Sequence, residues 1–267
     1  MKKLLLCVST AFLAMLAGCS EGIGGGDFLT NLSGNNKIYY TTTDGKKVVL
    51  SGNFDSILIS NTYKNGKGCL TFDEEVTIIG ESAFYDCENL LSIEIPDCVT
   101  SIGDHAFMYC SSLTSITIPA SVTSIGASAF IDCFSLTCFY GKFASEDSRC
   151  LIIDGTLDSF APAGLTEYTI PDSVTQIGDH AFMYCSSLTS ITIPDSVTSI
   201  GEGAFALCSS LTKVYCKPTT PPTGEYGMFN VINALERKIY VPTESVDAYK
   251  NAPYWDDFKS CIYGYDF

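Results

Sequence analysis

The chain contains two histidines, and each follows an aspartate and precedes a cysteine by five residues. Both lie in identical copies of the segment GDHAFMYCSSLTSITIP, at residues 103–119 and 178–194. A carboxylate, an imidazole and a thiol are the groups that a thiol hydrolase uses, and histidine and cysteine are also common zinc ligands. The first question is therefore whether Asp-His…Cys is a site made in duplicate or a unit of structure.

A repeat with a step of 23 residues contains both segments. Each unit follows the pattern Ile-Gly-x-x-Ala-Phe-x-x-Cys-x-x-Leu-x-x-Ile-x-Ile-Pro-x-Ser-Val-Thr. The phenylalanines that keep this step are Phe84, Phe107, Phe130, Phe182 and Phe205. A fixed period of this length marks a solenoid, in which one unit cannot bury its apolar face alone and therefore stacks on its neighbours.

The pattern within one unit predicts its local structure. Residues 113–118 alternate with a period of two, which predicts a half-buried strand. Pro119 then ends the strand, because proline has no N–H for a ladder. The Thr-x-Ile-Gly part predicts a second short strand, and Ala-Phe-x-x-Cys predicts a tight helical turn that buries its Ala, Phe and Cys. The predicted fold is a β-strand-rich solenoid with short helical turns.

The fourth unit is irregular. Phe160 and Leu165 mark a degenerate repeat, and the extra length lies near residues 142–159. There an Asp154-Gly155 pair separates two apolar runs, which predicts a hairpin. We expect this hairpin to jut from the edge of the solenoid.

The first residues form a separate unit. Lys2 and Lys3 precede an apolar run at residues 4–16, which is too short for a permanent membrane-spanning helix. This layout is typical of a secretory signal peptide. The run ends in Leu-Ala-Gly-Cys at residues 16–19, which resembles the lipobox of bacterial lipoproteins, and by that resemblance Cys19 is lipidated. The alternative is an ordinary signal cleavage with Cys19 as a bystander.

These observations predict the organisation of the chain. Because the open ends of a solenoid expose apolar rungs and strand edges, we expect a cap at each end. The expected parts are a signal peptide at 1–18, a lipidated tether at 19–36, an N-terminal β cap at 37–75, the solenoid with its hairpin insertion at 76–217, and a C-terminal cap at 218–267.

Residues from about 76 to 216 resemble the leucine-rich repeats of BspA-type bacterial surface proteins. The resemblance implies a leucine-rich repeat solenoid that acts in adhesion, and it transfers no catalytic residues. One position departs from the general pattern, which has Asn or Cys eight residues after the first leucine. This chain has Cys98, Ser121, Ser173 and Ser196 there. A serine hydroxyl is able to bond the turn backbone, so the departure leaves the predicted fold in place and leaves the side-chain bonding at this position open.

The stacking of coils also argues against a catalytic or metal-binding role for the histidines, in agreement with the resemblance. Three units separate His105 from His180, roughly 14 Å at about 4.8 Å per rung. One metal ion cannot bind both, since zinc–nitrogen bonds are about 2 Å long. The equivalent position holds Ser82, Ser128 or Gly203 in other units, as an ordinary surface position would. We therefore interpret Asp-His…Cys as structural and expect no catalytic, metal-binding or cofactor-binding residues.

The cysteines that keep the 23-residue step are predicted to be small buried core residues. Stacked side chains place their Cβ atoms about 4.8 Å apart, beyond the 3.5–4.5 Å that a disulfide prefers. A disulfide column or a metal column is the weaker alternative. The sequence leaves open whether the remaining cysteines form a bridge.

The outward row of the strands is the candidate binding face. Extended sheet faces are where solenoids bind partners. The residues of this face are Glu94, Thr117, Tyr140, Thr169, Thr192, Lys213 and Tyr215. Tyr140 and Tyr215 suit interface anchors. The alternative is that threonine lies on these strands only because of its β propensity.

The predicted function is non-enzymatic adhesion or binding at the bacterial outer membrane, with the chain lipid-anchored and surface-exposed. The expected partner is an extracellular matrix or cell-surface protein. The formal charge of −15 disfavours binding to nucleic acid and to anionic lipid headgroups. We therefore expect the chain to contact the membrane only through its lipid anchor. The alternative function is glycan capture by a carbohydrate-binding surface lipoprotein. A subunit that polymerises rung to rung and a hydrolase are less favoured, and no catalytic motif supports the latter.

Overall fold

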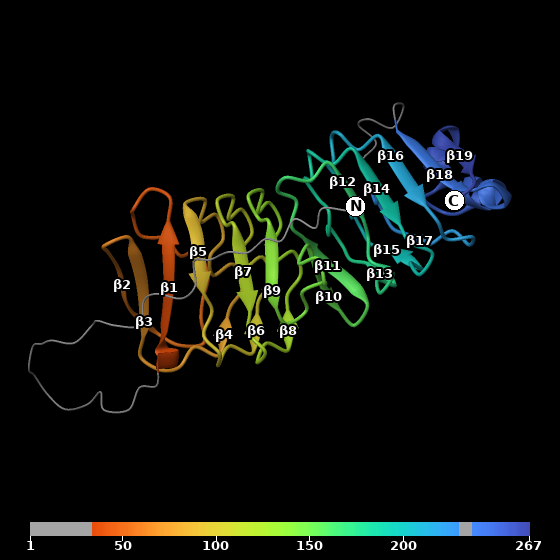
Figure 1. Cartoon of the computed structure of the whole chain (residues 1–267). Coiled ribbons are helices and arrows are strands. Elements are labelled where there is room, and N and C mark those ends of the chain that lie inside the picture. Colours follow the sequence, from red (N-terminus) through yellow and green to blue (C-terminus); the bar gives the residue numbers. More distant parts are fainter. Residues whose placement is uncertain (1–33, 230–236) are drawn as a thin grey trace, which may run out of the picture. The chain divides into compact units, whose positions relative to one another are not determined.

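The structure is a computed structural model and describes residues 34–229 and 237–267. Each regular coil contributes a short strand, a turn and a longer strand (Figure 1). Like strands of successive coils pair in parallel with a step of 23 residues, so that Ser101 pairs with Ser124 and Ser115 with Cys138. This pairing confirms the predicted solenoid of 23-residue units.

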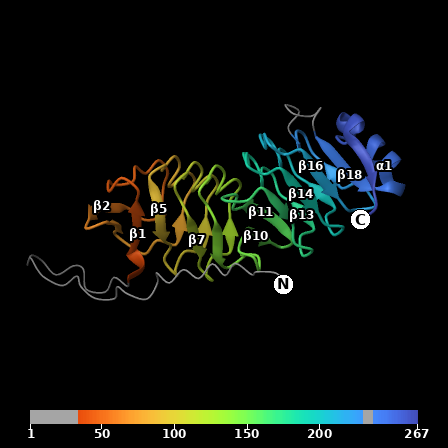
Figure 2. The same ribbon diagram turned by 45° about the horizontal axis from the view of Figure 1, so that its top comes forward.

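The short strands pair in two separate rows, one before and one after the irregular unit, and the longer strands after the first also pair in two separate rows; Figure 2 gives a second view. The short strands are β4 (Ile78–Ile79), β6 (Ser101–Ile102), β8 (Ser124–Ile125), β13 (Gln176–Ile177), β15 (Ser199–Ile200) and β17 (Thr223–Gly224). The longer strands are β5 (Leu90–Glu94), β7 (Ser115–Ile118), β9 (Cys138–Gly141), β12 (Glu167–Thr169), β14 (Ser190–Ile193), β16 (Lys213–Cys216) and β18 (Lys238–Pro242).

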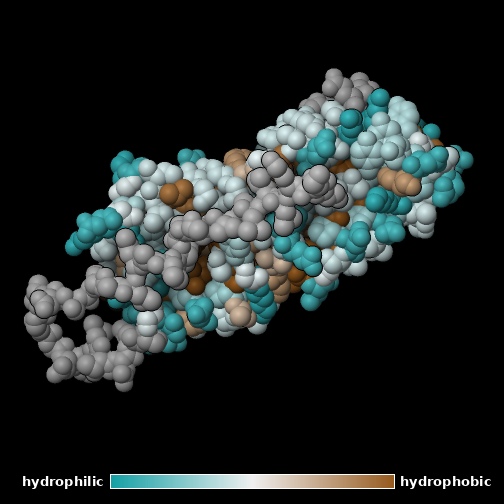
Figure 3. All heavy atoms as spheres, in the orientation of Figure 1, coloured by the Kyte–Doolittle hydropathy of each residue, from teal (hydrophilic) through white to brown (hydrophobic). Residues whose placement is uncertain are grey.

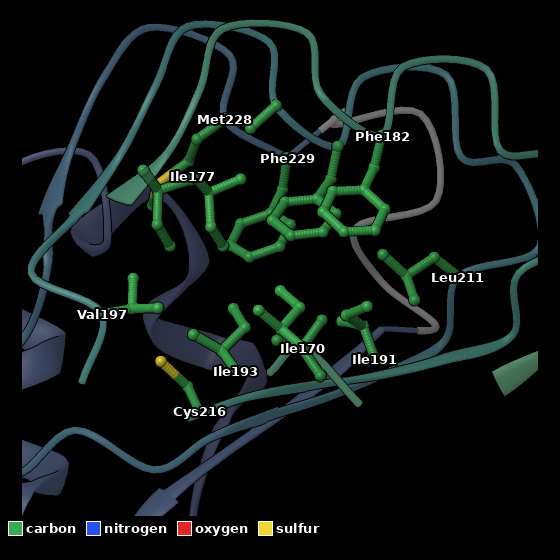
Figure 4. Packing of buried hydrophobic residues seen from close by; sticks show 14 of the residues in the cluster. Ile170, Ile177, Phe182, Ile191, Ile193, Val197, Leu211, Cys216, Met228 and Phe229 are labelled. Atoms are coloured by element: carbon green, nitrogen blue, oxygen red, sulfur yellow. The ribbon is translucent and has the colours of Figure 1, made fainter. Parts of the chain in front are cut away.

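Like side chains of successive coils stack inside the solenoid. The ring centroids of Phe84 and Phe107 are 5.1 Å apart with the planes 3° from parallel, and those of Phe182 and Phe205 are 5.0 Å apart at 14°. In Figure 4 the rings of Phe182 and Phe229 lie in one row above Ile170, Ile191 and Ile193. Full burial of one such side chain contributes about 1.5–3 kcal/mol. Each coil therefore gains its stability mainly from its neighbours.

Serine hydroxyls connect neighbouring coils at the position where leucine-rich repeats usually have Asn or Cys. Ser121 Oγ donates to the carbonyl of Val99 at 2.6 Å. Ser196 Oγ donates to the carbonyl of Val174 at 2.7 Å. At these two positions the structure shows that serine bonds to the backbone.

An antiparallel sheet lies at the N-terminal end of the solenoid. It follows the short 3₁₀ helix η1 (Gly34–Asn36) and contains β1 (Lys37–Thr42), β2 (Leu58–Lys64) and β3 (Lys67–Phe72). β1 also pairs antiparallel with β5, the first of the longer strands. The sheet thereby covers an edge that would otherwise expose unpaired N–H and C=O groups.

The insertion contains the predicted hairpin but places it differently from our expectation. β10 (Cys150–Ile153) and β11 (Thr156–Phe160) pair antiparallel, and Asp154 and Gly155 both have positive φ, as a type I′ turn requires. The hairpin does not jut from the edge, because β11 pairs in parallel with β13 and supplies the short strand of the fourth coil. The fully buried side chain of Leu157 explains this placement, since an apolar residue is more stable in the core than in water.

The row of longer strands continues beyond the regular sequence pattern. β16 pairs with β18, and β18 pairs with β19 (Ile262–Tyr265), all in parallel. Between these strands lie η3 (Thr243–Ser245), the helix α1 (Val246–Asn251) and η4 (Asp256–Cys261). The buried Trp255 closes this end, and its Nε1 donates to the carbonyl of Pro222 at 2.8 Å.

Candidate functional site

The duplicated Asp-His…Cys segments serve the stacking of coils. Asp104 Oδ1 accepts from the amide of Ala127 in the next coil at 2.8 Å, and Asp179 Oδ1 accepts from the amide of Glu202 at 2.9 Å. The histidine beside each aspartate has a positive φ, and the equivalent residues of other coils share this conformation: His105 56°, His180 58°, Ser82 56°, Ser128 58° and Gly203 57°. The position is therefore defined by a backbone turn that accepts different side chains.

Three of the repeat cysteines, Cys110, Cys133 and Cys208, form a hydrogen bond to the preceding coil. Cys110 Sγ donates to the carbonyl of Phe84 at 3.2 Å, and Cys208 Sγ donates to the carbonyl of Phe182 at 3.0 Å. Burial raises the pKa of the Cys87 thiol to about 12 and that of Cys110 well above its ordinary value. Such thiols stay protonated at neutral pH and are poor nucleophiles.

No disulfide joins the cysteines that the structure describes. In residues 34–229 and 237–267, no group of three or more His, Cys, Asp or Glu side chains is arranged to hold a metal ion. The same ranges contain no helix with the length and apolar character needed to cross a membrane.

The structure divides the predicted binding face into two segments. In the first, Thr117 on β7 pairs with Tyr140 on β9. The exposed Glu94 lies on β5, which contacts β7 but pairs with β1 in another sheet, and it forms an ion pair with Lys67 at 3.1 Å. The strand row then breaks, because β9 and β12 belong to different sheets. On the part of the surface that Figure 3 shows in colour, hydrophobic residues are seen in several small areas.

The second segment forms a continuous row across three strands. Thr169 on β12 pairs with Thr192 on β14, which pairs with Tyr215 on β16. Lys213 lies two residues before Tyr215, so that both side chains are on the same side of the strand. Four of the seven predicted face residues are thus neighbours in one sheet.

Four tyrosines end this row, and the sequence analysis identified only one of them. The rings of Tyr215 and Tyr240 stack with centroids 4.9 Å apart and planes 15° from parallel. Tyr265 packs edge-on against Tyr215 at 5.4 Å, and Tyr263 lies 6.3 Å from Tyr240. Tyr263 and Tyr265 are 46% and 42% exposed. We call Tyr215, Tyr240, Tyr263 and Tyr265 the tyrosine cluster.

A signal for the missed tyrosines is present in the sequence. Tyr240 and Tyr263 are separated by the same step of 23 residues as the regular units, and they pair directly in the structure. The step from Tyr215 to Tyr240 is two residues longer, which hides the continuation. A search for the period on both sides of the irregular segment would have found it.

Comparison with protein families identifies a family whose pattern matches most of the chain. The family described as BspA type Leucine rich repeat region matches the chain in 6 copies, over residues 35–145 and 157–252. Comparison with curated proteins finds no match.

Solved structures of bacterial leucine-rich repeat proteins are similar to this chain. A leucine-rich cell surface protein from Faecalibacterium prausnitzii aligns with a TM-score of 0.51 and 24% identity, covering 71% of this chain and 56% of that one. A leucine-rich repeat protein of T. pallidum has 28% identity and a TM-score of 0.35, covering 54% and 69% of the two chains. One from Bacteroides ovatus has 22% identity and a TM-score of 0.29, covering 72% and 76%. The likeness to the Faecalibacterium protein supports the fold, and this chain spans little more than half of that protein.

Proposed function

We propose that this chain, which belongs to the BspA-type leucine-rich repeat family, is a non-enzymatic binding protein of the bacterial cell surface. The proposed binding surface is the outward side of β12, β14, β16, β18 and β19. The expected partner is a protein of the extracellular matrix or of another cell surface.

The tyrosine cluster is the observation that carries this proposal. Four aromatic rings meet on one sheet face, with Tyr263 and Tyr265 partly exposed. Tyrosine suits an interface anchor, because it buries a large area, loses few rotamers and keeps a hydroxyl for hydrogen bonding. The short side chains of Thr169 and Thr192 beside the cluster leave room for a partner to lie along the strands.

We further propose that the chain is held at the outer membrane by lipid on Cys19, after removal of residues 1–18 as a signal peptide. Cys19 and residues 20–33 of the proposed tether lie outside the described residues. The lipid anchor is therefore supported by the sequence pattern alone. Mass spectrometry of the mature N-terminus tests it. A Cys19→Ala variant recovered from the membrane fraction with an unmodified N-terminus would contradict the lipid anchor.

A binding array with matched variants tests the surface. The purified protein without its predicted signal peptide is applied to matrix proteins, cell-surface proteins and glycans. For the ligand found, a Tyr215→Ala/Tyr240→Ala variant is expected to bind at least tenfold more weakly, as anchor residues do. Tyr85→Ala is the control, because Tyr85 also contacts another tyrosine, Tyr109, at 5.5 Å but lies on a turn outside the sheet. Equal binding by both variants would contradict the proposed surface.

Glycan capture is the second candidate function, and the tyrosine cluster also favours it. Aromatic rings present an electron-rich face against which the C–H groups of a sugar ring can pack. The same array separates the two functions. Saturable binding to a neutral oligosaccharide alone, lost in the double tyrosine variant, would favour glycan capture over protein adhesion.

A further inference from the structure

The fourth coil lacks the turn that the other regular coils carry between their two strands. In the third coil residues 126–137 separate β8 from β9, whereas in the fourth coil only residues 161–166 separate β11 from β12. The Ala-Phe-x-x-Cys part of the repeat is missing there. As a result, the fourth coil places no turn between the turn of the third coil and that of the fifth coil.

Elsewhere the turns are joined by backbone hydrogen bonds from each coil to the next. The amide of Phe84 donates to the carbonyl of Ala106 at 2.8 Å, and the amide of Phe182 donates to that of Ala204 at 2.8 Å. In the third coil, no described residue accepts from the equivalent amides of Ser128, Phe130 and Asp132. In the fifth coil, no described residue donates to the equivalent carbonyls of Asp179, Ala181 and Met183.

These two unpaired edges line one cavity. All six residues contribute to its wall, together with Asp158 and His180. Its volume is about 20 Å³, and an adjoining cavity of about 440 Å³ is lined by Phe134 and Tyr184. The rings of Phe134 and Tyr184 lie 6.5 Å apart and perpendicular to each other. We call the two cavities together the junction cleft.

Asp132 brings an uncompensated charge into the junction cleft. Its side chain is 5% exposed, and its Oδ1 has no hydrogen-bond partner among the described residues. Burial raises the pKa of this carboxyl to about 6, so the group is ionised at neutral pH. Among the described residues that line the cleft there is no lysine or arginine, and Asp158 and Asp179 add further carboxylates.

We propose that the junction cleft binds a lysine or arginine side chain from an extended segment of a partner protein. The cationic group would reach Asp132, where it neutralises a buried carboxylate and supplies the missing hydrogen bond. The exposed ring of Phe134 lies near the ring of Tyr184. Aromatic rings can pack against the apolar stem of a lysine or arginine side chain and attract its positive charge. The open amides and carbonyls along the cleft suit the backbone of the segment that carries it. This site is separate from the tyrosine cluster, and either could exist without the other.

A titration with short peptides tests the proposal. The probes are capped pentapeptides with alanine at four positions and arginine, lysine or alanine at the centre, and binding is followed by amide NMR shifts of the whole protein. We expect the arginine and lysine peptides to shift the signals of residues around Asp132 and His180, and the alanine peptide to leave them in place. An Asp132→Asn variant is expected to raise the dissociation constant at least tenfold.

Asp86→Asn is the matched control. Asp86 occupies the same repeat position with the same positive φ, but its amide donates to Met108 in the next coil and its side chain is exposed. The Asp86→Asn variant is expected to bind the cationic peptides with a dissociation constant within twofold of that of the wild-type protein. Equal losses in both variants, unchanged binding by Asp132→Asn, or no shift with any peptide would overturn the proposal. A neutral oligosaccharide that shifts the cleft signals when the cationic peptides do not would also overturn it.

Discussion

Replacing Asp132 by asparagine is expected to stabilise the folded protein at neutral pH. The change keeps the shape of the side chain and removes a charge that burial disfavours. The pKa of Asp132 is about 6 in the folded chain, against 3.8 for the ordinary carboxyl. This difference corresponds to about 3 kcal/mol at full effect, and screening by water at the cleft entrance reduces it to about 1–2 kcal/mol.

The sign of the effect depends on pH in a defined way. Because the folded pKa lies above the unfolded one, the wild-type chain loses no stability through Asp132 below about pH 4. It loses stability as the pH rises from about 4 to about 6, and the loss is constant above that range. Asparagine does not ionise. The advantage of Asp132→Asn is therefore largest above pH 6 and shrinks as the pH is lowered toward 4.5.

Thermal and urea unfolding of both proteins at several pH values measure this advantage. At pH 7.5 the melting temperature of Asp132→Asn should be higher by about 2–8 °C, and the gap should close on acidification. Asp86→Asn should stay within about 0.5 kcal/mol of the wild type, because Asp86 is exposed. A less stable Asp132→Asn variant at pH 7.5, or a gap that does not change with pH, would refute the reasoning.

Three further predictions concern the stacking of coils. Phe107→Ala should lower the free energy of unfolding by about 3–5 kcal/mol in urea titrations, because the ring is fully buried between two others; a loss below 1 kcal/mol would contradict its place in the core. Alkylation at pH 7.5 followed by mass spectrometry should leave Cys110 unmodified until denaturant is added, since burial raises its pKa, and fast labelling of the native protein would count against this. Gly126→Ala should destabilise by about 1–3 kcal/mol, because a Cβ there would lie 2.3 Å from the amide nitrogen of Asp104, whereas Gly34→Ala, which has open space, should not.

The regular coils could be predicted because their pattern is local and repeated. One unit's alternation of apolar and polar residues predicts its strand, and the 23-residue step predicts which residues stack, as the parallel rings of Phe107 and Phe130 confirm. The same reasoning interpreted the histidines as part of the repeat, and His105 and His180 share their backbone conformation with Ser82 and Ser128. It did not foresee the positive φ of His105 and His180, because the constraint comes from the path of the turn.

The places where the period breaks could not be predicted in the same way. Periodicity reports contacts between neighbouring coils that are alike, so it carries no information about a coil that differs from both neighbours. The position of β11 as a rung depends on burial of Leu157 rather than on its hairpin turn. The tyrosine cluster depends on how β18 and β19 pair after an irregular segment.

The sequence by itself therefore determined the solenoid, its interior columns and the structural role of Asp-His…Cys, because each follows from a repeated local pattern. Tertiary structure alone decided that Asp132 and His180 line one cavity. These residues come together because a turn is missing from the coil between them, and only the packing of the flanking coils shows what that omission leaves exposed.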